Sequence, residues 1–265
     1  MQNLIARELK AHFKSWLIWS IAAIAFVTMI FAEFSAYYQN PEMAAVIEAL
    51  PQALVDAFSM GDTNLTSLSG FVAVAFVFLL LFQSVYSALL GHGILAKEER
   101  DKTAEFLMVL PISRVKILWG KTISALIYTT LLTAVIALSL HINAIPYSRG
   151  PHYQAFYFRL LFVLWFISVT FLCMGLALAG LMKNHKLSGI ISIGIVLVMY
   201  LLSIISSLSQ SVEFLSVFTF FKYYEAVDLI NPSELKIYPL MILSSVNTFS
   251  LLFLFRFYPI RDLRL

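Results

Sequence analysis

Charged residues are scarce in this sequence. Only 12% of the 265 residues are Asp, Glu, Lys or Arg, and 60% are hydrophobic, whereas soluble domains average about a quarter charged and nearly half apolar. A water-soluble fold of this length could not bury so much apolar surface. The apolar residues come in long runs that suit helices of about 20 residues in a bilayer. The sequence therefore predicts an integral membrane protein.

Several kinds of chemistry lack the residues they need. The single cysteine, Cys173, cannot form an intrachain disulfide. Gly120-Lys121-Thr122 ends like a phosphate-binding loop, but that motif needs glycine where Val115 stands. The five histidines have no metal-ligand spacing, and the Lys and Arg residues form no nucleic-acid-binding face. We expect no catalytic residue, metal or nucleotide site in this chain, and no nucleic-acid partner.

Six apolar runs predict an all-α membrane domain that occupies the whole chain, residues 1–265. The runs cover about residues 15–34, 68–95, 118–140, 156–182, 187–208 and 237–257, each close to the length that crosses about 30 Å of hydrocarbon. An even number of spans places both termini on the same side of the membrane.

Basic residues predict which side that is, because loops rich in Lys and Arg stay in the cytoplasm. With six spans, one side holds 14 of the 18 Lys and Arg residues. The other side holds only Arg149, Arg159, Lys222 and Lys236. Both termini are therefore expected in the cytoplasm.

The N-terminal stretch is amphipathic. Ile5, Leu9 and Phe13 fall near one helical face, and Arg7 and Lys10 fall on others. This pattern is typical of an interfacial helix at a membrane surface. We predict an elbow helix that leads into the first span.

Two further features concern the outer segments and the middle of the bundle. Segments 41–60 and 209–236 combine apolar, aromatic and charged residues, and we expect short helices near the outer membrane surface in both. Gln83 and Asn247 fall near the middles of their apolar runs, where an unpaired polar group is costly. Both are expected to point inward, as interhelical contacts or as candidate pathway residues.

The longest predicted cytoplasmic connection reads AKEERDKTAEFLMVLPISRVKILWGKTIS and differs from the rest of the chain. Asp101 or Thr103 can cap a short helix, and Glu105 falls in its first turn, where negative charge suits the helix dipole. Pro111 ends that helix and Ser113 can cap the next one. The connection therefore predicts a helix of about two turns, or about 12 Å, flanked by charge.

The same connection resembles the coupling-helix signature of permeases of the ATP-binding-cassette type 2 exporter class. The matching residues are Glu99, Lys102-Thr103-Ala104-Glu105-Phe106-Leu107, Leu110-Pro111-Ile112-Ser113-Arg114 and Lys121. Ala6-Arg7-Glu8-Leu9-Lys10 resembles the elbow opening of these permeases, and the six-span layout matches along nearly the whole chain. The likeness is to small six-span bacterial permeases grouped with bacitracin exporters and NosY-like subunits.

This resemblance implies a division of labour between subunits. Residues 98–114 would dock on a separate cytoplasmic ATPase that binds ATP and Mg, and a second permease copy or homologue would complete the pathway in the bacterial plasma membrane. The implied docking residues are Glu98, Glu99, Thr103, Glu105, Phe106, Leu107, Leu110, Pro111 and Arg114, and the implied elbow residues are Arg7, Glu8 and Lys10.

Other interpretations stay open at this point. The charged connection can be an ordinary loop that follows the distribution of basic residues. The chain can also be an ATPase-coupled transmitter that acts on an extracytoplasmic protein and moves no substrate. An intramembrane enzyme is the weakest alternative, because paired carboxylates or histidine clusters within the spans, which mark such sites, are not found in the sequence.

Overall fold

The computed structural model describes residues 1–40, 64–101, 112–182, 184–208, 210–230 and 236–260, with isolated positions between 42 and 55. In these parts of the chain all regular structure is helical, and six helices are long and apolar enough to cross a membrane. The predicted all-α, six-span architecture is thus confirmed.

The described helices follow the predicted spans closely and extend beyond most of them. The long ones are α1 (Gln2–Tyr37), α4 (Leu68–Arg100), α6 (Arg114–Asn143), α7 (Tyr153–Leu181), α8 (His185–Leu208) and α10 (Ile237–Phe257). Short elements are η1 (Gln210–Phe218), η2 (Phe220–Lys222), α9 (Ala226–Ile230) and η3 (Tyr258–Ile260). The last of the short elements continues directly from α10.

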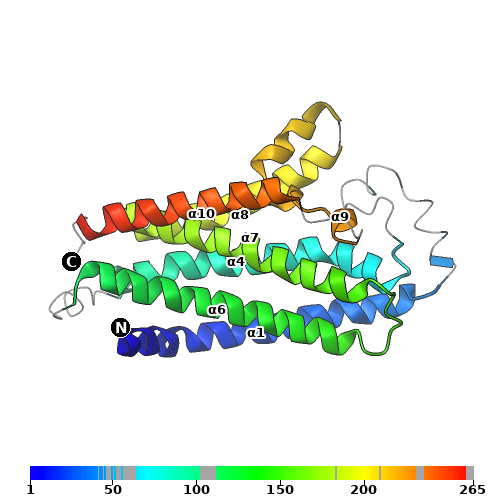
Figure 1. Cartoon of the computed structure of the whole chain (residues 1–265), viewed down its shortest axis with the longest axis horizontal. Helices are drawn as coiled ribbons and strands as arrows, with labels where there is room; N and C mark the ends of the chain where they lie inside the picture. The colour runs from blue at the N-terminus through cyan, green and yellow to red at the C-terminus, as the bar shows by residue number, and fades with distance from the viewer. Residues whose placement is uncertain are drawn as a thin grey trace.

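The centre of the bundle is the pair α4 and α7, which share the most extensive contact between helices. They lie between α1 and α6 on one side and α8 and α10 on the other (Figure 1). Two glycines bring the pair together. A Cβ atom added at Gly91 would lie 2.4 Å from the Leu172 carbonyl oxygen, and one at Gly175 would lie 2.5 Å from the Ala88 carbonyl oxygen. Small residues permit such close backbone packing in membrane helices.

One end of the bundle gathers the starts of α1, α6 and α8 and the ends of α4, α7 and α10 (Figure 1, left). We call it the basic end, because it carries Arg7, Lys97, Arg100, Arg114 and Lys121. The segments that join the helices at the opposite end include η1, η2 and α9, which confirm the short helices predicted within residues 209–236. Most of the other predicted outer segment, 41–60, lies outside the described residues.

The N-terminal helix is present, but as the first turns of α1 and not as a separate elbow. α1 runs unbroken from Gln2 to Tyr37, since this stretch contains neither proline nor glycine, and 36 residues span about 54 Å. Its early turns pack along α6. The Tyr128 hydroxyl donates to the Leu9 carbonyl. The Leu4 side chain packs directly over Gly120.

Candidate functional site

Charged side chains from three helices meet inside the basic end. We call Arg7 and Glu8 of α1, Glu98 of α4 and Lys121 of α6 the ion cluster. The Lys121 amine donates to Glu98 Oε1 at 2.6 Å and to the Ile94 carbonyl at 2.7 Å, and it lies 3.4 Å from Glu8 Oε1. Arg7 bridges the same carboxylates, at 2.7 Å from Glu8 and 3.2 Å from Glu98. The cluster therefore ties α1, α4 and α6 together.

Local sequence explains how these groups come within reach. Lys121 lies two turns into α6, on a face that also buries Ile117 and Leu118. Its neighbour Gly120 has no side chain, so Leu4 packs directly on α6, and a Cβ there would lie 2.6 Å from Leu4 Cδ2. Glu8 follows Leu4 by one helical turn on the same face of α1. The glycine thus sets the separation at which Glu8 reaches the lysine.

Burial makes these charges depend on one another. The side chains of Lys121 and Glu8 are fully buried, whereas Arg7 is 47% exposed. Burial alone would raise the pKa of Glu8, but Lys121 and Arg7 outweigh it and hold this pKa below its usual value of 4.5. Both carboxylates are then balanced by two cations. Loss of one partner would leave a buried charge uncompensated, which is strongly destabilising.

Two residues of the cluster, Glu98 and Lys121, lie in the helices that precede and follow the predicted coupling segment. Glu98 lies in the last turn of α4, which Asp101 closes, and Lys121 lies near the start of α6. Ser113 caps α6 by accepting a hydrogen bond from the Lys116 amide, as the sequence predicts. The neighbouring Arg114 donates to the Pro259 carbonyl at 3.0 Å, which links the same region to the end of α10.

The predicted docking residues divide into two groups. Glu98, Glu99 and Arg114 are described, and Glu98 is turned into the bundle, where its side chain is only 10% exposed. Its observed contacts are internal, so any role toward an ATPase would be exerted through α6 and α1. The remaining predicted docking residues lie outside the described residues: Thr103, Glu105, Phe106, Leu107, Leu110 and Pro111. Of the elbow residues, Arg7 and Glu8 join the cluster and Lys10 is exposed.

The two candidate pathway residues occupy different places. Gln83 is fully buried and its amide donates to the Thr133 hydroxyl and the Thr129 carbonyl, so it joins α4 to α6. Asn247 lies on α10, which packs on α7, and its Oδ1 is buried with no hydrogen-bond partner among the described residues. No hydrogen bond between described residues joins the two. Gln83 therefore acts here as an interhelical contact, and a pathway role for either residue stays a prediction.

Sequence reasoning missed the structural role of Lys121. It enters the motif match, yet its burial and its two carboxylate partners were not predicted. One signal was available. Lys121 follows apolar Ile117 and Leu118 at helical spacing, and a lysine on such a face is rarely fully buried unless it is paired. Its partners in α1 could not be inferred from spacing, because Glu8 lies in a different helix far away in the sequence.

The fold and this end of the bundle define the class: a polytopic membrane protein whose described residues form six long apolar helices, three of them tied together by buried charges at the basic end. Comparison with known families makes the assignment specific. Residues 2–255 match the family described as ABC-2 family transporter protein, and the chain belongs to that family. Its members are membrane subunits, so the chain is a permease component of an ATP-binding-cassette transporter. A search of curated proteins found no match.

Proposed function

We propose that this chain is the permease subunit of an exporter and forms half of the translocation pathway. Family membership implies an ATP-binding-cassette ATPase as partner. In the proposed arrangement that ATPase is a separate cytoplasmic subunit, which binds ATP and Mg, and a second permease copy or homologue supplies the other half. The basic end then faces the cytoplasm of a bacterium, in agreement with the distribution of Lys and Arg.

The observation that best supports this function is the ion cluster near the end of α4 and the start of α6. Residues 98–114 connect these helices, so a partner that presses on the connection acts on both. Because Lys121 holds Glu98 at 2.6 Å and Glu8 at 3.4 Å, α1 would follow the same movement. A packed element with shared ionic contacts transmits a displacement as a unit more readily than separately solvated helices do.

Purification from native membranes tests the proposal directly. The tagged chain should recover an ATP-binding-cassette ATPase in about equal amount, and ATP hydrolysis should follow that partner when the two are separated. Hydrolysis that remains with the isolated permease would contradict the division of labour. Recovery of the ATPase without any vectorial transport, but with an extracytoplasmic protein bound, would instead favour the transmitter alternative.

A further inference from the structure

A cavity of about 320 Å³ lies between α1 and α4, and none of the four residues of the ion cluster is among its described lining residues. It forms because α1 packs chiefly on α6 and touches α4 much less. Its lining includes His12, Trp19, Tyr86, Leu90, Lys97 and Arg100. This volume lies at the lower end of the range for small-molecule sites, so it suits a headgroup with the first part of a chain rather than a whole large ligand.

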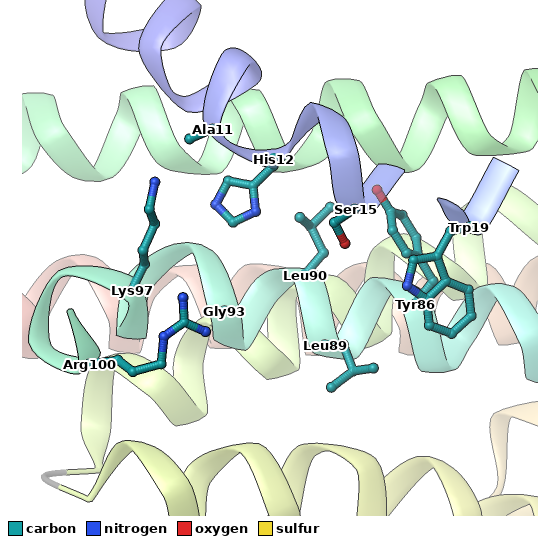
Figure 2. A pocket seen from close by; sticks show the side chains of 10 residues that line it. All are labelled: Ala11, His12, Ser15, Trp19, Tyr86, Leu89, Leu90, Gly93, Lys97 and Arg100. Atoms are coloured by element: carbon teal, nitrogen blue, oxygen red, sulfur yellow. The ribbon is translucent and has the colours of Figure 1, made fainter. Parts of the chain in front are cut away.

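The chemistry of the cavity changes along its length. Figure 2 shows Lys97 and Arg100 at one end, Trp19 and Tyr86 at the other, and His12 with Leu90 between them. Since Tyr86 and Arg100 are 14 positions apart on α4, the two ends are separated by about 21 Å along the helix axis. The cavity is therefore basic at one end and aromatic at the other.

The two cations that line the cavity, Lys97 and Arg100, are available to pair with an anion. Arg100 pairs with Asp101 in an exposed bridge, a type of contact that contributes little stability and is readily exchanged. No carboxylate is among the described residues that line the cavity. Burial lowers the pKa of His12 to about 4, and Lys97, Lys121 and Arg100 act in the same direction against Glu8. His12 is therefore neutral near pH 7 and offers a hydrogen bond instead of a third charge.

Tyr86 and Trp19 make the other end of the cavity aromatic. Tyr86 is only 2% exposed, and its hydroxyl has no hydrogen-bond partner among the described residues, although buried hydroxyls normally have one. The Trp19 ring packs beside it in a tilted arrangement, with ring centroids 5.5 Å apart. An apolar acyl chain would fill the space beside the two rings.

The cavity also crosses the expected membrane boundary. Ser15 and Trp19 fall inside the first predicted span, and His12 precedes it; on α4, Leu90 falls inside the second span and Lys97 beyond it. The cations thus lie at headgroup level and the aromatic rings lie deeper. Basic pockets between membrane helices at this level are suited to anionic lipid headgroups.

From these features we propose that the cavity between α1 and α4 binds an anionic phospholipid, with its phosphate at Lys97 and Arg100 and the upper part of an acyl chain along Leu90, Trp19 and Tyr86. One of the described lining residues, Arg100, also belongs to residues 98–114, the segment proposed to contact the ATPase. A bound lipid would fill the gap between α1 and α4 and would contact Lys97 and Arg100, which lie on either side of Glu98 along α4. Occupancy would therefore stabilise the position of α1 beside α4.

Fluorescence quenching can measure this binding because Trp19 lies in the cavity. A variant that keeps Trp19 alone, with Trp16, Trp119 and Trp165 changed to Phe, is placed in nanodiscs of phosphatidylcholine. Brominated phosphatidylglycerol or brominated phosphatidylcholine is then added at increasing mole fraction. We expect quenching at a much lower fraction of phosphatidylglycerol, and no reversal by excess inorganic phosphate.

Paired charge changes separate this site from general attraction to the membrane. In the same background, Lys97→Gln with Arg100→Gln should weaken the phosphatidylglycerol response about 25-fold, since each basic residue near an anionic surface contributes about 1 kcal/mol. The matched control, Lys116→Gln with Lys186→Gln, removes two exposed charges from the same end and should leave the response unchanged.

Several results would overturn the proposal. They are equal quenching by the two lipids, equal weakening by the two double variants, or displacement by inorganic phosphate, which would make free phosphate the ligand. Folding of each variant is followed through the buried thiol of Cys173. If the double variant unfolds, Lys97→Gln alone should still weaken binding about fivefold, and an unchanged response in this variant would equally refute the site.

Discussion

Replacement of Lys121 by methionine tests whether the ion cluster holds the basic end together. Methionine keeps much of the volume of the lysine stem but removes the amine that contacts Glu98 at 2.6 Å and Glu8 at 3.4 Å. Two carboxylates would then share Arg7, whose side chain is 47% exposed. The variant therefore leaves one buried negative charge without compensation.

The expected magnitude follows from distance and burial. At an effective dielectric constant of about 20, opposite charges 2.6 Å apart attract by about 6 kcal/mol, and desolvation offsets part of this. Removal of one partner from a buried pair typically costs about 3–5 kcal/mol. For a chain of this size each kcal/mol shifts the melting temperature by about 2–4 °C, so we expect Lys121→Met to melt about 6–20 °C lower than the wild type.

The single cysteine provides the assay. Cys173 is buried in α7, so a thiol-reactive dye should label it only as the protein unfolds with temperature. Lys116→Met is the matched control, because Lys116 is exposed on the same helix and surface changes usually stay within about 0.5 kcal/mol.

A double variant separates electrostatic pairing from simple packing. Lys121→Met combined with Glu98→Gln leaves Arg7 and Glu8 as a balanced pair, so much of the lost stability should return. The coupling energy between the two changes should reach about 1–3 kcal/mol, as for groups in contact. Equal melting of Lys121→Met and Lys116→Met, or strictly additive effects in the double variant, would refute the proposed role of the cluster.

Two further predictions concern topology and helix packing. Reporters fused after Leu265 should give a cytoplasmic signal and reporters within 209–234 an external one, and the reverse result for either would contradict the proposed orientation. Gly91→Ala should lower the free energy of unfolding by about 1–3 kcal/mol, because its Cβ would lie 2.4 Å from a backbone carbonyl of α7. A Cβ atom added at Gly93 would have no atom within 4 Å, so Gly93→Ala should leave the free energy of unfolding unchanged or raise it by about 0.5–1 kcal/mol. Equal effects of the two changes would refute the close packing at Gly91.

The six spans were predictable because apolar runs of this length have few alternatives to a membrane helix. The cap of α6 was also predictable, since Ser113 and the preceding Pro111 act within a few residues of sequence. The continuous α1 was not, because the change from charged to apolar residues near Ser15 resembles a boundary although no residue breaks the helix. The amphipathic pattern indicates which face of the helix is apolar. The direction in which the helix runs is determined by its packing on α6.

The ion cluster and the cavity between α1 and α4 depend on contacts between residues that are distant in the sequence, so local sequence does not predict them. Lys121 pairs with Glu98, which lies 23 positions away in the sequence. Arg7 pairs with the same carboxylate, 91 positions away. Even with each charge noted in the sequence, the pairing requires knowing that α1 lies beside α6 at Gly120. Gln83 illustrates the same limit. Its inward position was predictable because an unpaired polar side chain in a membrane span is costly, but its partner Thr133 was not predictable.

We propose that residues 98–114 form the site through which a separate ATPase acts on this permease. Leu107→Asp tests it most directly, with Phe214→Asp as control, because Phe214 is exposed in η1, outside the basic end. The measurement is the amount of ATPase recovered with each permease variant from native membranes. An unpaired charge in a desolvated interface should weaken binding about 100-fold, so we expect Leu107→Asp to lose the ATPase while it melts like the wild type, and Phe214→Asp to retain it. Full recovery of the ATPase with Leu107→Asp, and also with Glu105→Lys, would contradict the claim.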